Sequence, residues 1–312
     1  MVRLVIDTDP GVDDAHALLM GFAHPEARVE ALTTVAGNVG LDKTTANART
    51  ILDVLEVDPE RTPIFAGCDR AILGEQPDAA YVHGTDGLGD GPRTPSARPI
   101  QAEHAALALI RLANLYPGEL TLLALGPLTN VALALRLDPA LPQKYKRLVC
   151  MGGAIRGTGN MRERPVTEFN FFADPEAAAI VLGGWPGLSL VSWETTLLYP
   201  LSYENVQALK STGTPRSDFF GRITSRLSQY VEDALGRHGL YAPDPLAMAV
   251  ALEPDIVTRA ESHYVSVELA GAHARGQTCV DWADLTKQPP NVELVLEVDF
   301  ERFWGLMQAG VG

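Results

Sequence analysis

Residues 7–14, with the sequence Asp-Thr-Asp-Pro-Gly-Val-Asp-Asp, constrain the fold of this chain more than any other stretch. They follow the apolar run 2–6, and the Pro-Gly pair predicts a sharp turn between a strand and a helix. Asp13 and Asp14 then fall in the first turn of the helix, where the backbone dipole favours negative charge. Capping a helix needs one aspartate, but this stretch holds four. The stretch therefore predicts a site for a hard cation, Ca²⁺ or Mg²⁺, and the alternative is that the aspartates are helix caps in water.

Strand-like and helix-like segments alternate through the first two thirds of the chain. This alternation predicts an α/β fold: a mostly parallel, Rossmann-like open sheet with helices on both faces. A helical and hairpin part is expected to follow, and residues 1–312 are expected to form a single domain. The expected strands are residues 2–6, 29–35, 63–66, 120–125, 147–151 and 188–193, then 264–269, 278–282 and 292–298. The main C-terminal helices are expected at residues 219–235, 244–252 and 300–308.

Polar or glycine-rich groups recur just after successive expected strands. They are residues 7–14, Asn38, the pair 125–126, the pair 152–153, and Glu194. The carboxyl ends of parallel strands meet at one edge of a sheet, where ligands bind in open α/β folds. The spacing therefore predicts one shared cleft, although glycine and asparagine also serve simply to make turns.

Charge and hydropathy exclude several classes of partner. The net charge of −14 argues against a nucleic-acid partner, which requires a basic face. No run of 18 apolar residues predicts a membrane span, and no charged-then-apolar leader precedes the first strand. The three widely spaced cysteines form no pattern of a disulfide framework or a zinc site. A soluble, cytoplasmic protein is expected.

Residues 7–15 closely resemble the N-terminal motif of the inosine–uridine-preferring nucleoside hydrolases. The resemblance covers nearly the whole chain, and its motifs come in order. These are Ala36-Gly37-Asn38, residues 83–89 (His-Gly-Thr-Asp-Gly-Leu-Gly), Gly126-Pro127-Leu128-Thr129-Asn130, Met151-Gly152-Gly153, Gly159-Asn160, Glu168-Phe169-Asn170 and Asp174-Pro175-Glu176-Ala177.

The resemblance implies Ca²⁺-dependent hydrolysis of the N-glycosidic bond of ribonucleosides, giving free base and ribose, by a homodimer or homotetramer. The implied ligands of the ion are Asp9, Asp14, the backbone carbonyl of Leu125, and Asp244. Asp9 would also take a proton from the attacking water. The residues implied to hold the sugar are Asp13, Asn38, Met151, Asn160, Glu168 and Asn170. A cation that orients the sugar diol also predicts preference for ribo- over 2′-deoxyribonucleosides.

One position departs from the family pattern. Many members have His-Asp-Pro where this chain has Pro243-Asp244-Pro245, and that histidine is associated with protonating the leaving base. The candidates to replace it are His83, His238, Tyr230 and Tyr241, each of which could instead have a surface or packing role. Stacking of the base by Tyr81, Trp193, Tyr230 or Tyr241 is a further possibility, although aromatic residues more often belong to a core.

Three alternatives stay open. The loop 156–167 carries Arg156, Arg162 and Arg164, which could meet a phosphate on a larger substrate or simply lie in solvent. The chain could also be a nucleoside-binding or weakly active relative that has lost activation of the leaving base. A Mg²⁺-dependent aspartyl phosphatase with Asp7 as nucleophile is the third, although the supporting motifs of that class cannot be placed.

Overall fold

The computed structural model describes residues 1–235 and 239–312, and within them one sheet has eight strands. Its order is β3-β2-β1-β4-β5-β6-β10-β7. Neighbouring strands are parallel except β10 and β7, which are antiparallel. The bounds are β1 (Val2–Thr8), β2 (Ala27–Thr34), β3 (Ile64–Ala66), β4 (Leu120–Ala124), β5 (Arg147–Met151), β6 (Leu188–Val191), β7 (Val257–His263) and β10 (Val292–Val298). The predicted α/β fold with a mostly parallel sheet is confirmed.

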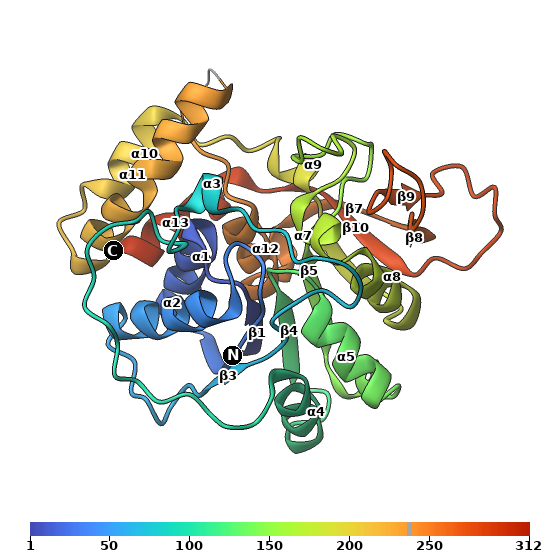
Figure 1. The fold of residues 1–312 in the computed structure, drawn as a ribbon, viewed down its shortest axis with the longest axis horizontal. Helices are drawn as coiled ribbons and strands as arrows, with labels where there is room; N and C mark the ends of the chain where they lie inside the picture. Colours follow the sequence, from blue (N-terminus) through green and yellow to red (C-terminus); the bar gives the residue numbers. More distant parts are fainter. Residues whose placement is uncertain (236–238) are drawn as a thin grey trace.

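Helices cover both faces of the sheet (Figure 1). Alternate residues of β1 face opposite sides, so Leu4 and Ile6 belong to one buried core and Val5 to the other. The first core is completed by α1 (Val12–Ala23), α2 (Leu41–Val54), α10 (Tyr203–Lys210), α11 (Pro215–Leu235), α12 (Pro243–Leu252) and α13 (Phe300–Val311). The second is completed by α4 (Ala105–Leu115), α5 (Thr129–Leu137), α6 (Leu141–Lys144) and α8 (Pro175–Gly184).

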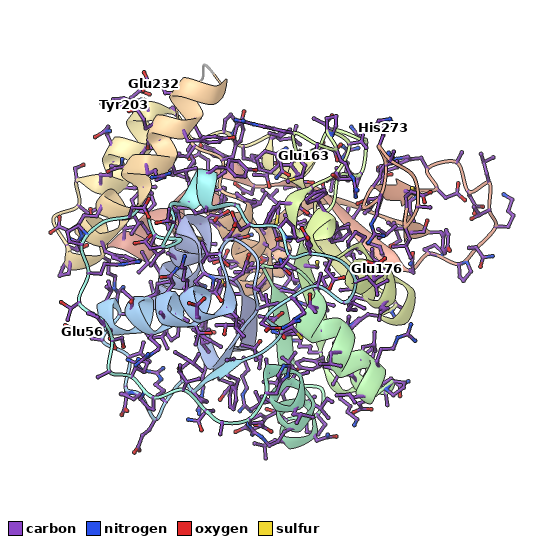
Figure 2. All side chains as sticks on the ribbon, in the orientation of Figure 1. Glu56, Glu163, Glu176, Tyr203, Glu232 and His273 are labelled. Atoms are coloured by element: carbon purple, nitrogen blue, oxygen red, sulfur yellow. The ribbon has the colours of Figure 1, made fainter. Side chains whose placement is uncertain are left out.

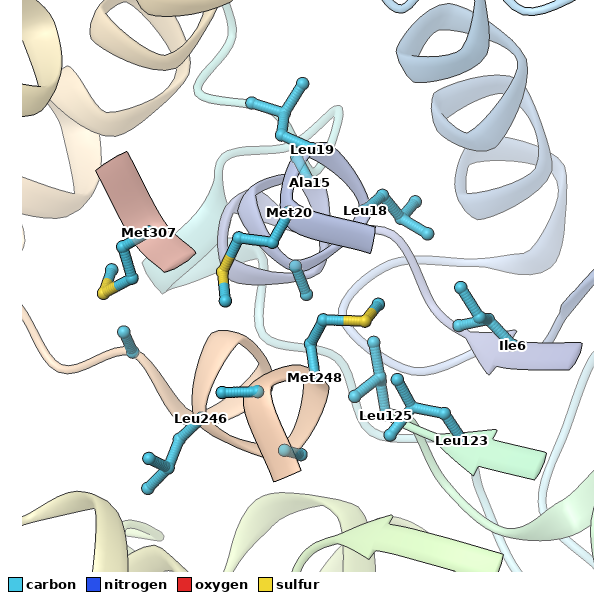
Figure 3. Close-up of a cluster of buried hydrophobic side chains, with 14 of the residues drawn as sticks. Ile6, Ala15, Leu18, Leu19, Met20, Leu123, Leu125, Leu246, Met248 and Met307 are labelled. Carbon is cyan, nitrogen blue, oxygen red and sulfur yellow. The ribbon is translucent and has the colours of Figure 1, made fainter. Parts of the chain in front are cut away.

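Helices α1 and α12 pack closely against each other. Met20 and Met248 lie between them, together with Leu125 from the end of β4 (Figure 3). A Cβ atom at Gly21 would lie 2.9 Å from Cε of Met248, so glycine permits this approach. The packing brings the first turn of α1, with its two aspartates, to the first turn of α12, which carries Asp244.

Several boundaries differ from the sequence-based expectation. Strand β7 was not expected, because most of its residues are exposed and lack an apolar face. Helix α10 was not expected either. The expected hairpin is confirmed as β8 (Val265–Val267) and β9 (Thr278–Val280), which pair in a separate antiparallel sheet. The remaining short elements are α3 (Ala80–His83), α7 (Phe169–Ala173), α9 (Trp193–Thr196) and the 3₁₀ helix η1 (Pro254–Ile256).

The long segment between β3 and α4 contains only one short helix, α3, and then passes outside α2 (Figure 1). Arg98 fastens it, since its buried guanidinium donates hydrogen bonds to the carbonyls of Leu52 and Val57. None of the described helices is long and apolar enough to cross a bilayer.

Candidate active site

The turn between β1 and α1 is stabilised by Asp14. Its carboxylate accepts hydrogen bonds from the Thr8 hydroxyl, from the Gly11 N–H at 2.9 Å, and from Asn38 Nδ2 at 3.0 Å. Asp14 therefore helps to cap α1 by accepting the N–H of the N-cap residue Gly11, but it is fully buried and is not a cap in water. Capping accounts for this one aspartate and does not account for Asp9 or Asp13.

Asp9 is buried, with 1% of its surface exposed, and only one of its two carboxylate oxygens accepts a hydrogen bond. Oδ2 accepts the backbone N–H of Asn38 at 2.7 Å. Oδ1 is buried and has no hydrogen-bond partner among the described residues. A Cβ atom at Gly37 or at Gly126 would overlap the carboxylate, so the two glycines leave room for Asp9 and hold it in place.

Asp13, Asp14 and Asp244 form a compact acidic cluster. One carboxylate oxygen from each lies within 4.8 Å of the others. Burial, followed by the charges of Asp13, Asp14 and Asp9, raises the pKa of Asp244 well above its ordinary value. Burial and the charge of Asp14 likewise raise the pKa of Asp9. Among the described residues, no lysine or arginine forms an ion pair with these acids.

This arrangement fits a divalent cation with oxygen ligands. Leaving a buried carboxylate unpaired costs several kcal/mol, whereas a helix cap contributes only about 1 kcal/mol. The orphaned Oδ1 of Asp9 and the unpartnered Oδ1 of Asp13 are both acceptors, as Ca²⁺ or Mg²⁺ requires. The sequence placed Asp13 with the sugar, and the structure also places its carboxylate beside the two predicted ligands Asp14 and Asp244.

A cavity of about 500 Å³ opens above the acids at the carboxyl edge of the sheet. Most of the residues singled out from the sequence line it: Asp13, Asn38, Tyr81, His83, Leu125, Met151, Asn160, Arg162, Glu168, Asn170, Trp193, Tyr230, Tyr241, Pro243 and Asp244. Asp9 and Asp14 do not line it and lie buried beneath it. The cleft expected from the strand ends is present and is lined by Asp13, Asn38 and Leu125, whereas Gly126, the pair 152–153 and Glu194 do not line it.

One wall of the cavity is built by Glu168 and Asn170 at the start of α7. The Glu168 carboxylate accepts backbone N–H groups of Gly153 and Asn170, both at 2.8 Å. Burial nevertheless raises the pKa of Glu168 to about 7. Asn170 Nδ2 donates to the carbonyls of Leu125 at 2.7 Å and Met151 at 3.2 Å, so this amide is fixed to the ends of β4 and β5. The Leu125 carbonyl, a predicted cation ligand, carries that hydrogen bond in this structure.

His83 is buried in the cavity wall with a defined tautomer. Its Nδ1 accepts the backbone N–H of Val12 at 3.2 Å, which leaves the proton of the neutral ring on Nε2. Burial lowers the pKa of His83 to about 4, so the ring is neutral near pH 7. The Nδ1 of His83 lies 3.7 Å from Asp13 Oδ1, but because the ring is neutral the two side chains do not form an ion pair at this pH. His83 can donate a hydrogen bond from Nε2, but it is not a reservoir of protons.

Two aromatic pairs line the rim of the cavity. The ring of Tyr81 packs edge-on against that of Tyr230, with 5.8 Å between the ring centroids, and the ring of Trp193 packs edge-on against that of Tyr241, with 5.7 Å between them. Pro243 also lines the cavity and offers no side-chain donor. The last candidate for a leaving-group acid, His238, lies outside the described residues.

Of the three loop arginines, only Arg162 lines the cavity, and its guanidinium lies 5.8 Å from the centroid of the Tyr81 ring. Arg156 lies over Trp282 and Arg164 over Phe172, away from the cavity. Glu163, beside Arg162, lies on the outer surface (Figure 2). The loop therefore offers one cation, not a cluster, to a substrate.

Sequence reasoning missed part of the apolar wall. Leu227 and Val231 line the cavity from α11, and Met161, Phe169 and Leu197 contribute elsewhere. The sequence of α11 shows an amphipathic pattern, but this pattern does not reveal that the apolar face of the helix reaches a cavity.

Asp7 is fully buried, and its Oδ1 accepts hydrogen bonds from Thr33 and Asn130. Its Oδ2 has no hydrogen-bond partner among the described residues, and Asp7 does not line the cavity, so the structure gives no support to the phosphatase alternative, in which Asp7 is the nucleophile.

Comparison with known proteins finds similarity along nearly the whole chain. The family described as inosine-uridine preferring nucleoside hydrolase matches residues 4–305. The pyrimidine-specific ribonucleoside hydrolase RihB of Escherichia coli (strain K12) is 32% identical over 307 residues, which is 98% of this chain and 96% of that protein. A plant nucleoside hydrolase structure has a TM-score of 0.92 at 31% identity and covers 99% of this chain and 98% of its own. An inosine-guanosine nucleoside hydrolase structure has a TM-score of 0.90 at 34% identity, and the match covers 100% of this chain and 99% of that one.

Proposed function

The chain belongs to the inosine-uridine preferring nucleoside hydrolase family, and from that premise we propose that it hydrolyses ribonucleosides with the help of a calcium ion and with Asp9 as the base. It is a ribonucleoside hydrolase, an enzyme that cleaves an N-glycosidic bond. The observation that carries the finer proposal is the orphaned Oδ1 of buried Asp9, next to three clustered carboxylates under a cavity of about 500 Å³. The oligomer and the cytoplasmic location stay predictions.

The proposed ligands of the ion are Asp9, Asp14, Asp244 and the carbonyl of Leu125. Bound there, a divalent cation supplies positive charge that offsets the clustered acids, acidifies a nearby water and orients the sugar diol. Asn38 connects two of these ligands, because its Nδ2 donates to the Asp9 carbonyl at 3.2 Å and to Asp14 Oδ2 at 3.0 Å. Loss of the Asn38 amide would therefore disturb two ligands at once.

Asp9 suits the role of base because its two oxygens differ. Oδ2 is held by the Asn38 N–H, and Oδ1 is free to accept a proton from water. Cleavage of a ribosyl C–N bond develops positive charge on the sugar, as in glycoside hydrolysis. The acids beneath the cavity stabilise that charge, while Asn160, Glu168 and Asn170 bind sugar hydroxyls. These roles all require a substrate with its ribose toward Asp13 and its base toward the aromatic rim.

A reducing-sugar assay over a panel of purine and pyrimidine ribonucleosides tests the proposed function. We expect release of ribose together with free base from at least one member. A 5′-monophosphate arm tests Arg162, and preference for the nucleoside would remove the phosphate hypothesis. Fast cleavage of p-nitrophenyl riboside, which needs no leaving-group acid, with background rates on every natural nucleoside would instead identify the weakly active alternative. No release from any substrate, including that riboside, would refute the proposal.

We propose that the Nε2–H of His83 donates a hydrogen bond to the leaving base. Replacing His83 with glutamine is expected to lower kcat/KM for natural nucleosides by about 10- to 100-fold, the value of a hydrogen bond to a group that gains charge. Cleavage of p-nitrophenyl riboside should be nearly unchanged. His104→Gln is the matched control, because the Nδ1 of His104 also accepts a backbone N–H, at 3.2 Å from Ala106, and His104 does not line the cavity. Equal losses on both kinds of substrate would contradict this role.

A further inference from the structure

Glu194 follows β6 but does not line the cavity, unlike its neighbour Trp193. Its carboxylate accepts three backbone N–H groups from a single turn, those of Ile155, Arg156 and Thr158. The bonds from Arg156 and Thr158 are both 2.8 Å long. Hydrogen bonds to an ionised acceptor are stronger than neutral ones, so Glu194 holds this turn firmly.

The turn leads directly into the segment 158–162, which lines the cavity and carries Asn160. The segment is also held by backbone hydrogen bonds at Gly159 and Asn160. The N–H of Gly159 donates to the Pro165 carbonyl at 2.8 Å, and that of Asn160 donates to the Thr167 carbonyl at 3.0 Å. Gly159 is required there, because a Cβ atom would overlap the backbone of Thr167. Asn160 is thus held by its own backbone and by the Glu194 anchor that precedes it, and only the Glu194 anchor depends on a side-chain carboxylate.

The position of Glu194 also links two walls of the cavity. Trp193 donates its backbone N–H to the Gly153 carbonyl at 3.0 Å, and its ring packs against Tyr241. One helical turn, α9, therefore connects the sugar-side segment with the aromatic rim. Displacement of the 155–158 turn would change the distance between these walls.

We infer that Glu194 is a positioning residue that holds the 155–162 segment so that Asn160 meets the sugar. The inference rests on the proposed function, through the sugar contact assigned to Asn160. Glu194 would affect binding of the substrate and of the transition state alike, because Asn160 contacts the sugar and takes no part in the reaction itself. The expected kinetic consequence is a change in KM more than in kcat.

Glu194→Gln keeps the shape of the side chain but has one acceptor oxygen and places an NH₂ group against the remaining N–H donors. We expect KM for the best nucleoside to rise about tenfold, the value of a hydrogen bond or two, with kcat within about threefold of wild type. Glu194→Asp, which keeps the charge on a shorter side chain, should recover part of the loss and serves if the glutamine variant folds poorly. An unchanged KM in both variants would overturn the inference.

Asp299→Asn is the matched control. Asp299 caps α13 by accepting the N–H groups of Glu301 at 3.0 Å and Arg302 at 3.2 Å, and it lies away from the cavity. It should lower thermal stability without changing KM. A similar rise in KM in this control would show that the effect at Glu194 is general destabilisation and would overturn the inference.

A double-mutant cycle tests whether Glu194 acts through Asn160. If it does, the double variant Glu194→Gln/Asn160→Ala should have nearly the same KM as Asn160→Ala alone. Independent effects that multiply would overturn the inference.

Trypsin provides a readout that needs no activity. The segment offers cleavable bonds after Arg156 and Arg162, while Arg164 is protected by Pro165. We expect cleavage at the first two sites to be faster in Glu194→Gln than in wild type or Asp299→Asn. A wild-type enzyme that releases no ribose would refute the proposed function, and the proteolysis result would still stand. Active wild type with equal cleavage rates in all three proteins would refute the inference alone.

Discussion

Replacing Asp9 with asparagine is expected to lower kcat for ribose release by about 10⁴-fold, the upper end of what a general base contributes. Asparagine has nearly the same volume, so it fits between Gly37 and Gly126 and can still accept the Asn38 N–H. It cannot take a proton from water, and it contributes no negative charge to the cation site. A reducing-sugar assay and a thermal melt together measure the loss of rate and the retention of the fold.

The control for this variant is Asp42→Asn. Asp42 lies in the first turn of α2, is exposed and does not line the cavity, so its replacement removes one negative charge outside the site. It should leave kcat within about twofold of wild type, because exposed charges away from the site contribute little. If Asp9→Asn retained more than a tenth of wild-type kcat, another group would have to be the base.

The mostly parallel sheet and the place of its cleft could be predicted because local patterns and topology agree. Strand β4 is buried on both faces, as its nearly unbroken apolar sequence indicates. The Pro-Gly turn after β1 likewise determines where α1 begins. Strand β7 could not be predicted in the same way, because it pairs at the sheet edge through its backbone while most of its side chains lie in solvent.

The acidic cluster was predictable only in part. The sequence places Asp13 and Asp14 together, but Asp244 joins them through the packing of α1 on α12, a contact made by Met20, Gly21 and Met248. The resemblance to a known family supplied that pairing, and periodicity alone could not. The tautomer of His83 was also beyond the sequence, since it depends on the N–H of Val12, 71 positions away along the chain.

Removal of divalent cations is expected to abolish ribose release and to lower the melting temperature, with Ca²⁺ restoring both. A ligand at 100 times its Kd stabilises the folded state by about 2.7 kcal/mol. The loss on chelation should grow with pH. The pKa of Asp244 is raised in the fold, so without a cation the folded state binds more protons than the unfolded chain, and stability falls as pH rises above about 4. Melting curves at pH 5 and pH 8, with chelator and with Ca²⁺, measure this difference.

The variant Asp244→Asn distinguishes the contribution of the cation from that of the acids around it, because its expected changes in melting temperature with chelator and with Ca²⁺ have opposite signs. In chelator it should melt at a higher temperature than wild type, because asparagine is neutral without a bound proton, whereas Asp244 must either keep a proton or be charged beside Asp13 and Asp14. In Ca²⁺ it should melt at a lower temperature than wild type and release ribose about 10²- to 10³-fold more slowly, since a lost electrostatic contact to the transition state has this size. Full ribose release by wild type in chelator, or an equal response of both proteins to Ca²⁺, would contradict a cation at this cluster. The crossing of the two melting temperatures follows from the geometry, because carboxylates this close and without a cationic partner destabilise the fold alone and stabilise it around a divalent ion.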